Sequence, residues 1–195
     1  MACVSLVKGR GLDCNRISGG VKYVYFGVYD QFDAPTNGTG IVIASSEVTD
    51  IEMSTNTLYR YAVPRGSTNC LETITGNTEN GSLFYNPGVT MVLNKLTKED
   101  QNEIKALGQN QLVIFCQLNA QLANGHDIIT CMGVQNAMSL NAGTAESGSA
   151  FGDRNGYTLT WDGMEANPFA MVADYLTVPF DNAAFNFGTG NPATS

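Results

Sequence analysis

The sequence predicts a mainly β protein, a β-sandwich or barrel with one packed α-helix and an extended C-terminal arm. Short segments rich in Val, Ile, Tyr and Thr recur along the chain, and each is closed by Gly, Pro, Asn or Ser. Their spacing of about 8–12 residues is typical of sandwiches and barrels. One segment, residues 98–107, has the pattern of a helix, and the chain after residue 167 combines apolar side chains with prolines.

The composition favours a folded chain with few surface charges. Of the 195 residues, 43% are hydrophobic and only 14% are charged, whereas charged residues usually make up about a quarter of a soluble domain. Disordered chains show the reverse combination, low hydrophobicity with high charge. The net charge of −8 argues against nucleic-acid binding, because neutralising phosphates is the dominant source of that affinity.

The expected strands are β-branched or aromatic segments bounded by turn residues. They cover residues 21–29, 40–44, 48–53, 57–63, 70–75, 82–85, 89–93, 112–118, 127–132, 135–140 and 157–161. The continuous apolar run at 112–118 predicts a strand buried on both faces. Pro87 predicts a break, kink or turn between 82–85 and 89–93, since proline cannot donate to a strand ladder. The Gly, Ser and Ala residues of 141–150 predict a loop.

The helix is expected over residues 98–107, about three turns. Thr97 is suited to the N-cap position, and the helix dipole favours Glu99 and Asp100 in the first turn. Gly108 predicts the end of the helix, because the residue after the C-cap commonly needs a positive φ. The expected buried stripe consists of Leu96, Ile104 and Leu107.

Two regions are expected, a β domain at residues 1–167 and an extension or docking arm at residues 168–195. The arm contains Phe180, Phe185 and Phe187. Because burying a phenylalanine gains about 1.5–3 kcal/mol, we expect the arm to dock on its own domain or on a neighbouring subunit. The alternative is a frayed tail.

The residues offer little support for an active site. His126 is the single histidine, and it follows the turn dipeptide Asn124-Gly125. A nucleophile activated by His126 is an alternative that no neighbouring residue supports. The five cysteines lack the short spacings of a zinc site: Cys3, Cys14, Cys70, Cys116 and Cys131. We therefore expect no enzyme activity and no catalytic, cofactor-binding or metal-binding residues.

Targeting signals are also not evident. No apolar run approaches the roughly 18 residues of a membrane span, and the apolar residues before Lys8 are too few for a signal-peptide core. We expect synthesis in the cytoplasm with reduced thiols.

Two stretches near the ends of the β domain carry a family resemblance. Residues 14–26, CNRISGGVKYVYF, resemble the opening strand of phage tail tube proteins, in which a Cys and a Gly-Gly precede a strand rich in Val, Lys and Tyr. Residues 147–160, SGSAFGDRNGYTLT, are similar to the closing hairpin of those proteins. The chain thus resembles the phage tail tube, or major tail, proteins over residues 3–168.

The resemblance implies a structural protein of the virion tail. It implies hexameric rings that stack into a tube, through which DNA passes without specific binding, and partners limited to other copies and other virion proteins. It also implies a long hairpin that reaches the neighbouring ring, here at residues 75–89. The residues expected at subunit contacts lie in this hairpin and in the arm: Asn80, Leu83, Phe84, Tyr85, Pro87, Phe180, Phe185 and Phe187.

Two departures from the family pattern keep other functions open. They are the polar loop at residues 31–39 and the long tail after Pro168. The alternatives within the virion are a neck, connector or tail-terminator ring and a capsid decoration protein. A carbohydrate-binding sandwich module is a further alternative. Trp161 argues against it, because this residue alternates with threonines and is expected in the core rather than on an exposed binding face.

Overall fold

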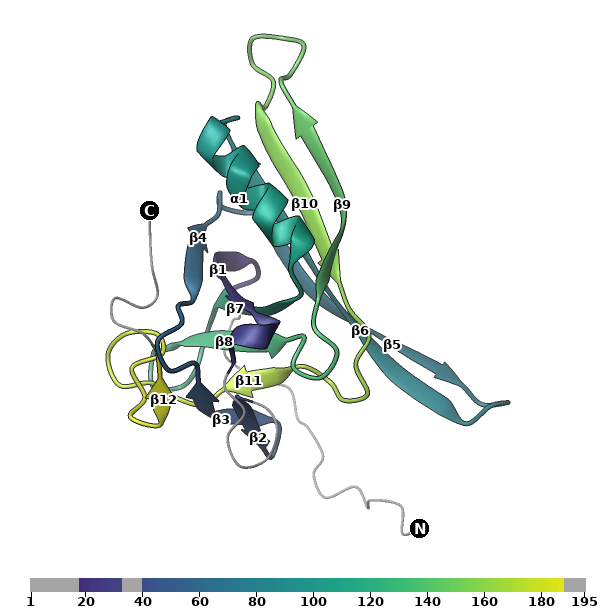
Figure 1. The fold of residues 1–195 in the computed structure, drawn as a ribbon, viewed down its shortest axis with the longest axis vertical. Helices are drawn as coiled ribbons and strands as arrows, with labels where there is room; N and C mark the ends of the chain where they lie inside the picture. The colour runs from purple at the N-terminus through teal and green to yellow at the C-terminus, as the bar shows by residue number, and fades with distance from the viewer. Residues whose placement is uncertain (1–17, 33–39, 188–195) are drawn as a thin grey trace.

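The computed structural model describes residues 18–32 and 40–187, which form two β-sheets and one α-helix (Figure 1). Sheet A has eight strands in the order β12-β3-β11-β8-β7-β1-β4, with β2 paired to β3. Sheet B has four strands in the order β5-β6-β10-β9. The prediction of a mainly β sandwich with one helix is confirmed for the described part of the chain.

The strand bounds follow most of the expected segments. The strands of sheet A are β1 (Val21–Val28), β2 (Ile41–Ala44), β3 (Glu47–Glu52), β4 (Tyr59–Ala62), β7 (Leu112–Gln121), β8 (Asp127–Met132), β11 (Ala170–Val172) and β12 (Phe185–Asn186). Those of sheet B are β5 (Asn69–Asn77), β6 (Ser82–Asn94), β9 (Ser139–Glu146) and β10 (Gly156–Asp162). A 3₁₀ turn, η1 (Tyr29–Gln31), follows β1.

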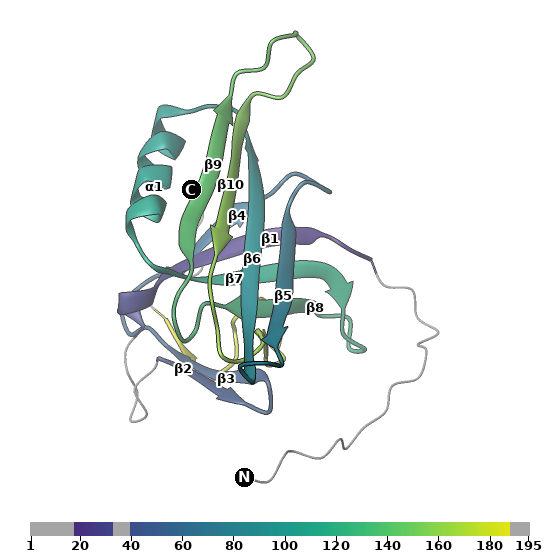
Figure 2. The ribbon, with the colours of Figure 1, turned by 90° about the vertical axis from the view of Figure 1, so that its right-hand side faces the viewer.

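The first hydrophobic core lies between the two sheets. The strands of sheet B cross over β1, β7 and β8 rather than run along them (Figure 2). Alternate residues of β10 face this core, and Tyr157, Leu159 and Trp161 are 5%, 3% and 0% exposed. They meet Phe26 and Ile114 from sheet A. Trp161 is therefore a core residue, as its alternation with threonines predicts.

A second core covers the other face of sheet A. Strand β7 supplies both cores, with Ile114 and Cys116 in the first and Val113 and Phe115 in the second. All residues of β7 from Leu112 to Gln117 are buried. The prediction of a strand buried on both faces is confirmed, because the apolar run has no polar side to present to solvent.

The chain after residue 167 packs on the domain that precedes it. Strand β11 pairs with β8 and β3, and β12 pairs with β3. Phe180 is 5% exposed, and its ring meets those of Tyr25 and Phe115 edge-on, with centroids 5.0 and 5.3 Å away. Phe185 and Phe187 pack partly buried beside it. The described part of the arm thus docks on its own chain, one of the two expected alternatives.

The helix α1 (Lys98–Gln109) begins as predicted but ends later. The Thr97 hydroxyl accepts a hydrogen bond from the Asp100 N–H at 3.1 Å. The predicted end at Gly108 is wrong, because the helix continues to Gln109 and the Asn110 side chain donates to the Ala106 carbonyl at 2.8 Å, satisfying a terminal acceptor. Within the described residues, no helix is long and apolar enough to cross a membrane.

The inner face of α1 differs from the expected stripe in one residue. Leu107 is buried and Ile104 packs partly buried against the first core. Leu96 precedes the helix and is 37% exposed, so its predicted place in the stripe is wrong. Gly108 faces β9 instead, and a Cβ there would lie 3.3 Å from Leu140 Cδ2.

The predicted break at Pro87 is also wrong, because β6 runs through it from Ser82 to Asn94. Tyr85 exchanges both backbone hydrogen bonds with Glu165 on the side away from β5. Residues two apart in a strand point their backbone groups to the same side. The missing N–H of Pro87 therefore faces Gly163, and the pairing of Pro87 with Glu72 of β5 continues.

The strand expected at 135–140 is wrong except for 139–140, and the loop expected at 141–150 is wrong for 141–146 but confirmed for 147–150. The chain turns between Gly133 and Ala137, which have φ values of 81° and 58°, and β9 then extends to Glu146. Gly143 lies opposite Leu159, and a Cβ there would approach Leu159 Cδ2 to 2.9 Å. The small residues of β9 thus reflect close packing against β10, which overrides their low strand propensity.

Phe180→Ala is expected to lower the free energy of unfolding by about 3–5 kcal/mol, because it leaves a cavity among packed aromatic rings. Urea denaturation followed by tryptophan fluorescence measures this change. The matched control is Leu176→Ala, which removes a side chain that is 77% exposed in the same arm and should change stability by less than about 0.5 kcal/mol. Equal effects of the two substitutions would contradict the described docking of the arm.

Candidate functional site

The hairpin of β5 and β6 projects beyond the rest of the molecule (Figure 1). Strand β10 pairs with β6 only from Gly88 to Asn94. The ladder between β5 and β6 continues much further, to the pair of Asn77 with Ser82. From Pro87 to the tip of the hairpin, β5 and β6 therefore form a two-stranded ribbon. The exception is a bridge between Tyr85 and Glu165.

One face of this ribbon continues the first core outward. Directly opposed residues share a face of a sheet, and the pair of Cys70 with Val89 packs in the core. The next pairs on the same face are Glu72 with Pro87, Ile74 with Tyr85, and Gly76 with Leu83. We call Ile74, Leu83, Tyr85 and Pro87 the apolar face of the hairpin. Ile74 and Leu83 are 64% and 57% exposed.

The opposite face and the tip of the hairpin are mostly polar. The Asn86 side chain donates to the Thr75 hydroxyl at 3.2 Å. At the tip, the Asn77 side-chain oxygen accepts from the Glu79 N–H at 2.8 Å and from the Asn80 N–H at 3.4 Å. These bonds define the turn before any partner binds, so ordering the hairpin on binding costs little entropy.

The base of the hairpin is tied to the chain that follows β10. The Tyr85 N–H donates to the Glu165 carbonyl at 2.9 Å, and the Glu165 N–H donates back at 2.8 Å. The Phe169 N–H donates to the Glu72 carboxylate at 2.6 Å. These three bonds fix the direction in which the hairpin projects.

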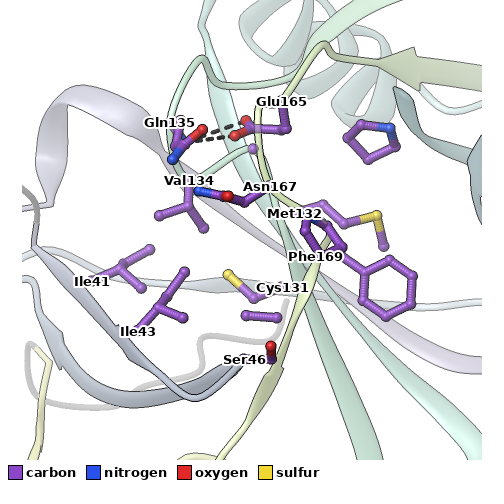
Figure 3. A pocket seen from close by; sticks show the side chains of 14 residues that line it. Ile41, Ile43, Ser46, Cys131, Met132, Val134, Gln135, Glu165, Asn167 and Phe169 are labelled. Carbon is purple, nitrogen blue, oxygen red and sulfur yellow. Dashed lines mark hydrogen bonds between the residues drawn. The ribbon is translucent and has the colours of Figure 1, made fainter. Parts of the chain in front are cut away.

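A pocket of about 470 Å³ lies beside this base (Figure 3). It is formed by β2, the end of β8, Pro87 of β6 and the chain that leads into β11. Its wall is mixed. The apolar part includes Ile41, Ile43, Met132, Val134, Pro87 and Phe169, and the polar part includes Ser46, Gln135, Glu165 and Asn167. Because Pro87 also belongs to the apolar face of the hairpin, the pocket and that face adjoin one another.

Glu165 is the charged residue in the wall of the pocket, and it is 7% exposed. Its carboxylate accepts from the Gln135 N–H at 3.1 and 3.3 Å and from the Asn136 N–H at 3.1 Å. Burial raises the pKa of Glu165, although the two backbone N–H groups act in the opposite direction. The side chain therefore holds the 133–138 turn against the chain after β10.

His126, Cys70 and Cys116 are not part of the pocket wall, whereas Cys131 lines it (Figure 3). His126 Nδ1 is 2.7 Å from Asp174 Oδ1, and the ring stacks on Tyr175 at 4.6 Å. Cys70 and Cys116 face the first core and Cys131 the second, while Cys3 and Cys14 are outside the described residues. Among the described residues, no three His, Cys, Asp or Glu side chains are grouped to hold a metal ion.

The predicted contact residues fall into two separate groups. Asn80, Leu83, Phe84, Tyr85 and Pro87 lie together on the hairpin, with Phe84 on its polar face. The arm residues Phe180, Phe185 and Phe187 pack on their own chain, as described above, which accounts for these aromatic residues without a subunit contact. A contact of either group with a neighbouring subunit remains a prediction.

Sequence reasoning missed two exposed apolar residues that belong to projecting segments. Ile74 was included in a strand but not recognised as exposed, because the length of the free ribbon depends on where β10 stops pairing. Phe151 is fully exposed in the loop between β9 and β10. Its neighbours Gly148, Ser149, Ala150 and Gly152 are small, and an aromatic residue among them is the signal that could have identified it.

Glu165→Gln is expected to remove one contribution to the pH dependence of stability. With a raised pKa, the folded state binds the proton more tightly than the unfolded chain. Protonation of Glu165 therefore stabilises the folded state. This stabilisation is fully present below the unfolded pKa of about 4.3 and is lost as pH rises through the folded pKa. In urea titrations between about pH 4 and pH 7, the stability of the parent protein should therefore fall relative to that of the variant. A relative rise would contradict the raised pKa.

No family model matches the chain, and neither a curated protein nor a solved structure does. The functional assignment therefore rests on the sequence resemblance and on the geometry of the hairpin and the pocket.

Proposed function

We propose that the chain is a structural subunit of a bacteriophage virion, which assembles with copies of itself into rings that stack as the tail tube. One observation carries the proposal. The apolar face of the hairpin continues the core of the molecule outward, and the described residues of the chain leave Ile74 and Leu83 largely exposed. The position of this hairpin agrees with residues 75–89, where the resemblance to tail tube proteins implies the contact with a neighbouring ring.

The energetics favour coverage of this face by another protein surface. An isolated two-stranded ribbon is marginally stable in water. Burying the exposed parts of Ile74 and Leu83 would contribute roughly 2–4 kcal/mol per contact. Two stacked rings repeat such a contact once for every subunit, so the total rises with the number of copies in the ring.

The outer strands of sheet B support association between copies. These strands are β5 and β9, and neither has a second partner strand within residues 18–32 and 40–187. All of β9 except Leu140 is exposed. Unpaired strand edges are templates for pairing with another chain, and pairing β5 of one copy with β9 of the next would produce a ring. The resemblance implies six copies in it.

The net charge supports a role as a conduit for DNA. A chain with a net charge of −8 repels phosphates, so acidic residues that line a bore allow DNA to pass without binding. In this proposal no bond is made or broken, and the partners are other copies and neighbouring virion proteins. A neck, connector or terminator protein would stop at a single ring, and its hairpin would contact a different virion protein.

Negative-stain electron microscopy and light scattering of the purified chain test the proposal. We expect rings, and at higher concentration stacked rings or filaments. Rings that never stack would favour a neck, connector or terminator protein. A small oligomer that binds capsids would favour a decoration protein. A strict monomer at high concentration would contradict self-assembly.

Ile74→Glu is expected to raise the concentration needed for assembly by at least about tenfold, because it places a charge in a contact where apolar burial contributes about 1.4 kcal/mol or more. The midpoint of thermal unfolding should stay within a few degrees, since Ile74 is largely exposed. The control is Thr73→Glu, which adds the same charge on the opposite face of the same strand. Equal effects of the two changes would indicate a contact through charge alone and not through the apolar face.

A further inference from the structure

The loop between β9 and β10, residues 147–155, projects from the molecule on the side away from β2 and β3 (Figures 1 and 2). Phe151 lies in this loop and is fully exposed. A phenylalanine in this position gains nothing in an isolated subunit, because its whole apolar surface stays in water. A partner surface is the environment in which it would contribute free energy.

The loop that carries Phe151 is held in one conformation by Asp153. The Asp153 carboxylate accepts from the Ser149 N–H at 2.9 Å, the Ser149 hydroxyl at 3.1 Å and the Ala150 N–H at 2.6 Å. The Asp153 N–H donates to the Ala150 carbonyl at 3.0 Å. Gly148 has a φ of 75°, and a Cβ there would lie 2.7 Å from Asp153 Cβ. Phe151 is thus presented by a defined turn, which lowers the entropic cost of docking it.

The pocket beside the hairpin base offers a complementary cavity. Its volume of about 470 Å³ lies within the range of about 300–1,000 Å³ typical of binding pockets. Ile43 and Val134 line it together with the ring of Phe169, and Ile43 is 43% exposed at its edge (Figure 3). An aromatic side chain suits such walls, because it buries a large apolar surface and packs edge-on against another ring.

The loop and the pocket lie toward opposite ends of the molecule. In both views the loop is at the top, while β2 and β3 lie near the bottom (Figures 1 and 2), and β2 supplies Ile41 and Ile43 to the pocket. A surface at one end that fits a cavity at the other joins copies head to tail. Contacts of this kind repeat without closing when successive copies are stacked along one direction.

We propose that Phe151 of one copy inserts into the pocket beside the hairpin base of the next copy, and that this contact joins successive rings. The inference rests on the proposed self-assembly and specifies the contact that makes rings stack. It assigns separate roles to two surfaces. The apolar face of the hairpin stabilises association between copies, and the Phe151 loop with the pocket determines the direction and register of stacking.

Site-specific photo-cross-linking tests this contact. The variant carries the photo-reactive residue p-benzoylphenylalanine in place of Phe151. The protein is first assembled and then irradiated. After proteolytic digestion, the cross-linked peptides are identified by mass spectrometry. We expect cross-links to peptides containing Ile43, Val134 or Phe169, and only in assembled material. Assembly with cross-links to other regions would overturn the inference and leave the proposed function intact. Failure of the parent chain to assemble would overturn both.

A mixing experiment gives an independent result. Phe151→Ser removes the inserted side chain, and Ile43→Arg places a charge at the edge of the pocket, so each variant alone should form rings but need at least about tenfold more protein to stack. Mixed together, each supplies the surface that the other lacks, and paired rings should appear. Phe151→Leu, which keeps an apolar side chain, should stack nearly as the parent does. Unimpaired stacking of Phe151→Ser would overturn the inference.

Discussion

Strand β6 has 13 residues, but only the seven from Gly88 to Asn94 pair with β10. The rest of β6 has β5 as its ladder partner, and this difference in length places apolar side chains beyond the core that the two sheets share. Cys70 and Val89 lie on the same side of the hairpin as its apolar face, at the part that packs on sheet A. Ile74 and Leu83 lie on that side where the ribbon projects. Because sheet faces alternate strictly, the ribbon cannot move these side chains to a covered position without losing its register.

The remainder of the molecule holds the hairpin in a fixed direction. Strand β7 is buried between two cores, so sheet A provides a stiff layer against which β6 and β10 pack. The segment after β10 binds the hairpin base through Glu165 and Phe169 and then enters sheet A as β11. The pocket lies at the junction of these elements. In the proposed assembly, a rigid projection beside a preformed cavity would allow repeated, directional contacts between copies.

Elements that neighbouring residues determine could be predicted from the sequence. Features that depend on pairing between distant segments could not. Alternation in residues 157–161, the apolar run of β7 and the Thr97 cap predicted two strands and the start of a helix correctly, because neighbouring residues decide them. The sequence-based expectations at Pro87 and at β9 were wrong. The missing N–H of Pro87 faces Gly163 rather than β5, and the small residues of β9 are explained by Leu159, which packs against Gly143. At the candidate site, the hairpin was located from the sequence, but the exposure of Ile74 and the pocket depend on contacts between segments far apart in the chain.

Hydrogen–deuterium exchange of the hairpin amides tests the central claim most directly, because it reports whether another copy covers the ribbon. The same protein is measured below and above the concentration at which it assembles. The account predicts that peptides from β5 and from β6 before Pro87 exchange markedly more slowly after assembly, while the buried strand β7 changes little. Assembly with unchanged exchange along the hairpin would show that copies associate through another surface and would contradict the account.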